Sequence, residues 1–131
     1  MKRTNLSIGL LRSLLVLASC LMYGAAIAHH SFADFDTDTS KTIHGVVKEI
    51  WFKNPHVRYY ITVKEENGDE SVWDAHTSSV NVLVRHGWMK DSIKVGDEVD
   101  MIGSPAKDGA PRLMVHTVKL SNGVVVSSRG N

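Results

Sequence analysis

The sequence contains a single cysteine, Cys20, which lies within the first 28 residues. If those residues are removed on export, the remaining chain can form neither a disulfide bond nor a thiolate metal site. The sequence also lacks an HExxH motif, a Gly-x-Ser-x-Gly elbow and a phosphate-binding glycine loop. No nucleophilic triad can be assembled from its serines. We therefore expect a protein that is not an enzyme.

The sequence also lacks a large excess of either acidic or basic residues. The full chain has 15 bases and 14 acids, and three of those bases but none of the acids fall within residues 1–28. Removing these residues leaves 103 residues with a net charge of −2, enough for one domain with a modest core. Proteins that bind nucleic acids or membrane surfaces usually carry an excess of basic residues. We therefore expect an unidentified small ligand or a protein as the partner, and no nucleic acid.

Residues 1–28 have the layout of a secretory signal peptide. Lys2 and Arg3 precede an apolar stretch at 13–23, and Ala26 and Ala28 stand at the two positions that signal peptidase inspects. The stretch is shorter than the roughly 20 residues of a membrane span. No later segment is apolar enough to span either, so we expect no transmembrane segment in the mature chain.

A second cleavage site is present in the same segment. Residues 17–20 also fit a bacterial lipoprotein box, and cleavage before Cys20 would leave a lipid anchor on that residue. Such a cut would leave a short apolar core and bypass the Ala26-x-Ala28 site. Cleavage after Ala28 is therefore favoured, with the lipid anchor at Cys20 as the alternative.

Cleavage after Ala28 would start the mature protein with two histidines. The amine and imidazole of His29 could then chelate one ion, and His30 could add its ring and the preceding amide nitrogen. Nitrogen ligands in a plane suit Cu(II). If the arm at 29–41 folds back, His56 or, more weakly, His76 could supply a further imidazole. The alternative is incidental copper binding by an extended terminus.

The remaining residues have the pattern of strands around one short helix. The predicted elements are strands at 42–52, 57–64 and 71–76, a helix from Ser78 or Ser79 to His86, strands at 98–103, 112–120 and 124–126, and a frayed tail at 127–131. This order predicts a mainly β domain over 42–126, a small OB-like barrel of five to six strands with its helix between strands 3 and 4. A small open β-sandwich is the alternative.

The hairpin at 57–76 alternates polar and apolar residues, which predicts the direction of each side chain. The side chains expected to face the core are Tyr59, Ile61, Val63, Trp73 and Ala75. Those expected to face outward are Arg58, Tyr60, Asp74 and His76. OB-folds bind ligands on the outer face of strands 2 and 3, so we predict a ligand face there, with His56 and His76 at one end of the hairpin. An ordinary solvated face is the alternative.

Several segments resemble a bacterial family of unknown function whose members are short exported proteins. The segments that carry the resemblance are 28–32 (Ala-His-His-Ser-Phe), 45–47, 54–56 (Asn-Pro-His), Trp73, 85–88, 94–99 and 106–109. The resemblance implies a periplasmic protein but no established ligand or activity. The family pattern has an acidic or small residue near His76, which favours His29, His30 and His56 as metal ligands.

Three hypotheses follow. The first is a periplasmic OB-like binding module, and the second is a protein that binds copper or another transition metal through His29. The third is a copper-dependent redox enzyme. The small size of the domain leaves little room for a substrate cleft, which counts against the third.

Overall fold

The structure is a computed structural model that describes residues 33–128. The predicted signal peptide at 1–28, with its expected cleavage residues, and both His29 and His30 lie outside the described residues. The elements in chain order are β1 (Lys41–Trp51), β2 (Arg58–Lys64), β3 (Glu70–His76), α3 (Val80–Arg85), β4 (Glu98–Pro105), β5 (Arg112–Leu120) and β6 (Val125–Ser127). In the described part of the chain, no helix is long and apolar enough to cross a bilayer.

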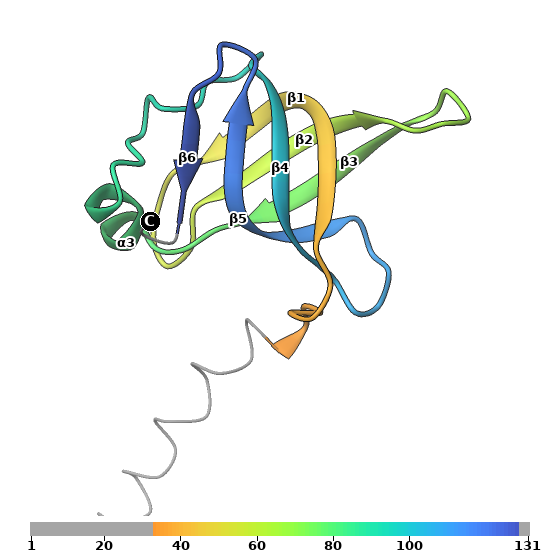
Figure 1. Cartoon of the computed structure of the whole chain (residues 1–131), viewed down its shortest axis with the longest axis horizontal. Helices are drawn as coiled ribbons and strands as arrows, with labels where there is room; N and C mark the ends of the chain where they lie inside the picture. The colour runs from red at the N-terminus through yellow and green to blue at the C-terminus, as the bar shows by residue number, and fades with distance from the viewer. Residues whose placement is uncertain (1–32, 129–131) are drawn as a thin grey trace, which may run out of the picture. The chain divides into compact units, whose positions relative to one another are not determined.

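The strands form one sheet that closes on itself. Their order is β3-β2-β1-β4-β5-β6, and β3 also pairs with β5, which makes a barrel of β1 to β5 with β6 added at one edge. The closing pair is parallel and joins 74–76 to 112–114. Figure 1 shows this closure, with α3 at one end of the barrel and the tip of the β2–β3 hairpin extending beyond it. The predicted OB-like barrel is confirmed, and the open sandwich is excluded because no such closing pair would exist in it.

The barrel interior is filled by the side chains that the hairpin pattern predicted to face inward. Tyr59, Ile61 and Ala75 are fully buried, and Val63 and Trp73 are partly buried against the same core. The core also holds the buried Trp88, from the segment after α3. Its indole Nε1–H donates a hydrogen bond to the Tyr59 hydroxyl oxygen at 2.8 Å, so the polar atoms of two large buried rings satisfy each other.

Helix α3 ends as predicted, but the residue that caps its start was not predicted. Gly87, with φ of 78°, follows its end and supplies the left-handed conformation expected of a helix stop. Ser79 is the N-cap residue, but in the described part of the chain its side chain makes no capping hydrogen bond. The Asn54 side-chain oxygen instead accepts the Val80 N–H at 3.1 Å. The Asn-Pro-His segment thus caps the helix from the β1–β2 loop.

The segment before β1 is fastened to the barrel. Phe35 is 3% exposed and forms an isolated β-bridge with Ala106. The Asp36 N–H donates to the Pro105 carbonyl oxygen and the Lys107 N–H to the Asp34 carbonyl oxygen, both at 2.9 Å. Figure 1 shows this segment beside the loop that follows β4. The sequence analysis assigned 29–41 to an extended arm, and within its described part Phe35 is packed because burial of an aromatic ring is favourable.

Candidate functional site

The outer side of β1, β2 and β3 carries a cluster of polar and aromatic side chains. Strand register aligns Trp51 with Arg58 and His76 in one row, and Tyr60 with Asp74 in the next. We call these five residues the hairpin face. The structure thus brings together the predicted ligand residues Arg58, Tyr60 and Asp74, and places His76 at the end of the same face.

An ion pair lies at the centre of the hairpin face. Arg58 Nε donates to Asp74 Oδ1 at 3.0 Å, and Arg58 Nη2 makes a second bond to Oδ2. The two side chains are only 30% and 18% exposed. His76 Nε2 also lies 3.0 Å from Asp74 Oδ2. The Asp74 carboxylate therefore receives two donors from Arg58, in the bidentate geometry that fixes Arg and Asp side chains most firmly, with the His76 ring beside it.

The electrostatics of Asp74 follow from these contacts. Burial alone would raise its pKa, but the hydrogen bonds from His76 and Arg58 outweigh that effect and lower the pKa to about 2. The hydrogen bond to Asp74 likewise raises the pKa of Arg58. Both groups are thus charged at neutral pH, and their charges balance each other within the face.

Aromatic rings flank this ion pair. The Trp51 and Tyr60 rings meet edge to face with centroids 5.7 Å apart. The Arg58 guanidinium carbon lies 5.6 Å from the Trp51 centroid and 5.5 Å from the Tyr60 centroid. Lys53 Nζ lies 4.4 Å from the Trp51 centroid, and Trp51 is still 38% exposed. Such an amphipathic ring beside fixed donors and acceptors is typical of recognition surfaces.

The sequence analysis missed Trp51 and Lys53. A register shift between Val47 and Glu49 adds a residue to β1, so that Trp51 points outward with Glu49. A simple alternation from the start of β1 cannot locate such a bulge. A tryptophan beside the Lys53-Asn54-Pro55 break is the one signal that could have identified the residue.

His56 and His76 lie at the same end of the hairpin, as predicted. The Thr77 N–H donates to the Val57 carbonyl oxygen at 2.9 Å, just beyond the pair of Arg58 and His76. His56 Nδ1 lies 3.2 Å from the carbonyl oxygen of Thr77, so its ring links two neighbouring loops. Within residues 33–128, no group of three or more His, Cys, Asp or Glu side chains is placed to hold a metal ion.

Phe35, which fastens the segment before β1 to the barrel, lies beside His76. We call this residue the Phe35 anchor. The two rings have centroids 5.6 Å apart, and the Arg112 guanidinium carbon lies 5.8 Å from the Phe35 centroid. Arg112 is the register partner of Asp74 across the closing β3–β5 pair. The chain thus enters the barrel next to the His76 end of the hairpin face.

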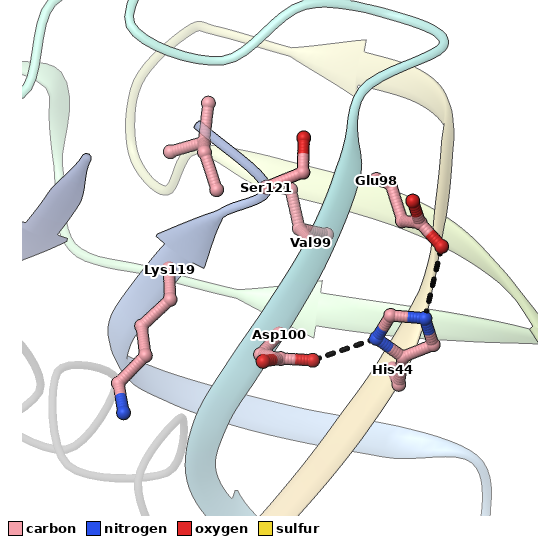
Figure 2. Close-up of a pocket in the computed structure, with 7 residues that line it drawn as sticks. His44, Glu98, Val99, Asp100, Lys119 and Ser121 are labelled. Atoms are coloured by element: carbon pink, nitrogen blue, oxygen red, sulfur yellow. Dashed lines mark hydrogen bonds and ion pairs between the residues drawn. The ribbon is translucent and has the colours of Figure 1, made fainter. Parts of the chain in front are cut away.

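A second polar cluster lies on β1 and β4. His44 Nδ1 lies 2.7 Å from Asp100 Oδ1, and Nε2 lies 3.1 Å from Glu98 Oε1. Figure 2 shows the ring between the two carboxylates, beside an open pocket of about 160 Å³ that Lys119 and neighbouring residues also line. The hydrogen bond to Asp100, supported by that to Glu98, raises the pKa of His44. Each ring nitrogen faces a different carboxylate, so this cluster is an ion-pair network across two strands.

Comparison with known families identifies the chain. A family of unknown function, DUF6152, matches residues 16–114. The chain belongs to this family. The comparison of this DUF6152 member with curated proteins finds no match. Among solved structures, it is similar to a mitochondrial single-stranded DNA binding protein from S. cerevisiae, with a TM-score of 0.50 and 13% identity over 63% of this chain and 93% of that one. That likeness supports the OB-like fold alone.

Proposed function

We propose that this protein is an exported, periplasmic binding module that holds its ligand on the hairpin face. The observation that carries the proposal is the half-buried Arg58–Asp74 pair, which lies between the exposed Trp51 ring and the His76 end of the face. Solvated surfaces rarely hold a bidentate ion pair this rigidly, because exposed pairs gain little from fixed geometry. The outer face of strands 2 and 3 is also where OB-folds bind their ligands.

The chemistry of the face favours an uncharged, ring-bearing ligand of the oligosaccharide class. The charge of Arg58 is balanced by Asp74, and the Trp51 indole donates its Nε1–H to Glu49. A sugar ring can stack on the exposed part of Trp51 while its hydroxyl groups pair with the fixed polar groups beside it. OB-folds are known to bind oligosaccharides on this face.

Nucleic acid is the other ligand class that OB-folds bind, and the similar yeast protein carries DNA binding in its name. Binding of a phosphate backbone depends on basic side chains that release counterions. After removal of residues 1–28 this chain has a net charge of −2, and Asp74 already neutralises the central arginine of the face. We therefore favour the neutral ligand.

The test is a glycan array probed with the mature protein, followed by titration of each hit by isothermal calorimetry. Trp51→Ala is expected to weaken binding of a hit by about five- to 150-fold, since stacking on an aromatic ring is worth ~1 to 3 kcal/mol. The matched control is Val95→Ala, which also shortens an exposed apolar side chain, in the loop before β4. It should leave affinity unchanged.

Two results would contradict this assignment. One is tight, salt-sensitive binding of oligo(dT) with no array hit, which would make the protein a nucleic-acid binder. The other is an array hit whose affinity is the same for Trp51→Ala and the native protein, which would move the ligand off the hairpin face.

We infer a second candidate function, binding of copper or another transition metal by the mature terminus at His29. The specific observation in its favour is the Phe35 anchor, because it holds the chain six residues after His29 against the barrel. The test is Cu(II) titration of protein whose start at His29 has been verified by intact mass. One alanine added before His29 should weaken binding strongly, and equal affinities would reject the chelate.

A further inference from the structure

The outer side of β1, β2 and β3 continues beyond the hairpin face as a row of uncharged side chains. Strand register aligns Val46 of β1 with Thr62 of β2, and Thr62 with Val72 of β3. Because side chains alternate along a strand, Thr62 shares the outer side with Tyr60, two residues earlier. Val46 and Val72 are 44% and 42% exposed. We call Val46, Thr62 and Val72 the valine row.

The valine row extends the hairpin face along the strands. Arg58, which is aligned with Trp51, and Thr62 lie four residues apart on β2, which is about 13 Å in a strand. This length exceeds one sugar ring, so a ligand that stacks on Trp51 can reach the valine row only as a chain of rings. Single exposed apolar side chains are ordinary, but two that flank one site beside an exposed indole indicate a surface on which apolar groups of a ligand are buried.

Charged side chains bound the valine row in both directions along the strands. Asp74 is paired with Tyr60 on one side of the row, and Glu70 is paired with Lys64 on the other. An apolar area confined in this way accommodates a small substituent of a sugar and is too short for a long acyl chain. A charged substituent over the row would lose hydration without gaining a partner of opposite charge from it.

An acetamido group has the chemistry that the valine row can bind. Its methyl group can pack between the side chains of Val46 and Val72, which removes apolar surface from water. The Thr62 hydroxyl between them can both donate and accept, so it can pair with the N–H or the carbonyl oxygen of the amide. A sugar hydroxyl directed at either valine would instead lose its bonds to water without replacement, which is unfavourable.

We propose that the ligand of the hairpin face is a linear oligosaccharide of N-acetylated amino sugars. One ring stacks on Trp51, and the acetamido methyl group of a later ring packs on the valine row. This inference rests on the binding function proposed above and names the class of ligand for that same site. Val46 and Val72 are specificity-determining residues in this arrangement, because they distinguish an acetamido group from a hydroxyl group.

The probes are tri-N-acetylchitotriose and cellotriose, which share linkage and length and differ in the acetamido group. Each is titrated into the mature protein by isothermal calorimetry. The acetylated trimer should bind at least about tenfold more tightly than cellotriose, because a buried methyl group and an added hydrogen bond together contribute that much. It should also bind more tightly than the N-acetylglucosamine monomer, and a monomer of equal affinity would contradict the extended site.

The decisive variant carries both Val46→Thr and Val72→Thr. Threonine keeps the branched shape that strands favour but replaces a methyl group with a hydroxyl group. The variant should bind the acetylated trimer about fourfold or more weakly, the effect of one methyl group left unburied, and should bind cellotriose like the native protein. The matched control carries Val124→Thr and Val125→Thr, at valines 48% and 55% exposed beside β6, and should change neither affinity.

The outcomes separate this inference from the proposed function. If both trimers bind equally, or if only another array glycan binds, and Trp51→Ala weakens that binding, the hairpin face binds sugars and the acetamido assignment is wrong. If the double variant binds the acetylated trimer like the native protein, the valine row is not its contact and the inference is overturned. If no glycan binds at all, the proposed function fails and the inference fails with it. Circular dichroism verifies the fold of each variant before titration.

Discussion

Replacing Asp74 with asparagine should destabilise the barrel by about 2 kcal/mol at neutral pH. The folded protein holds the pKa of Asp74 at about 2, against an ordinary value of 3.8. Each pKa unit corresponds to about 1.4 kcal/mol of preference for the charged form, so the ion pair contributes about 2 kcal/mol. That figure lies between the values for exposed and fully buried pairs, as the 18% exposure of Asp74 requires.

The same reasoning fixes the pH dependence. A lowered pKa stabilises the fold above the unfolded value of 3.8, and that contribution is lost as pH falls from about 4 towards 2. The difference in free energy of unfolding between native protein and Asp74→Asn should therefore be largest near pH 7. It should shrink as pH falls and be small near pH 2, where about half of the native Asp74 carboxyls are protonated. Urea denaturation followed by circular dichroism across this range measures it.

Asp108→Asn is the matched control for this prediction. Asp108 also pairs with an arginine, at 2.8 Å from Arg112 Nη2, but its side chain is 59% exposed. Asparagine preserves the acceptor that Asp108 offers to the Ala110 N–H. Its replacement should cost far less stability than that of Asp74 because exposed pairs are screened by solvent. A loss for Asp74→Asn no larger than that of the control, or one that persists unchanged at pH 2, would refute the reasoning.

Three further predictions concern the scaffold. The raised pKa of His44 stabilises the fold below the ordinary value of 6.5. This contribution, a few tenths of a kcal/mol for a side chain 65% exposed, should fade as pH rises above that value, and His44→Gln should abolish the slope in urea titrations. Asn54→Ala removes the acceptor for the Val80 N–H and should cost about 1 kcal/mol, whereas Asn54→Asp should retain stability in thermal melts. Gly45→Ala should cost ~1 to 3 kcal/mol in urea denaturation, because a Cβ there would overlap the Thr62 carbonyl oxygen.

The side chains of the hairpin face show which structural features can be predicted from the sequence. The predicted exposure of Arg58, Tyr60 and Asp74 depended only on alternation along two strands joined by a clear turn, a pattern with a fixed period of two. The order of the elements along the chain was predicted from a similarly local pattern of turn residues between them. The hairpin prediction was correct because its paired residues lie close in sequence, so the turn determines their register.

The residues that sequence reasoning missed depend on long-range contacts. The outward direction of Trp51 follows from a bulge in β1, and the burial of Phe35 follows from a bridge to Ala106, 71 residues later in the chain. Neither the bulge nor the bridge has a periodic signature, and Phe35 packs on Ala106 and Met114, which lie far along the chain.

Closure of the barrel explains why the polar cluster forms where the chain enters. The parallel β3–β5 pair sets Arg112 beside Asp74 and Met114 beside His76, and Phe35 packs on Met114 and Ala106 in a small core of its own. Because Met114 is also the β5 partner of His76, the Phe35 ring that packs on Met114 borders the His76 ring as well. The segment before β1 and the last residues of the β2–β3 hairpin therefore lie side by side. A disruption of the β3–β5 pairing should thus release Phe35 and alter the environment of His76 together.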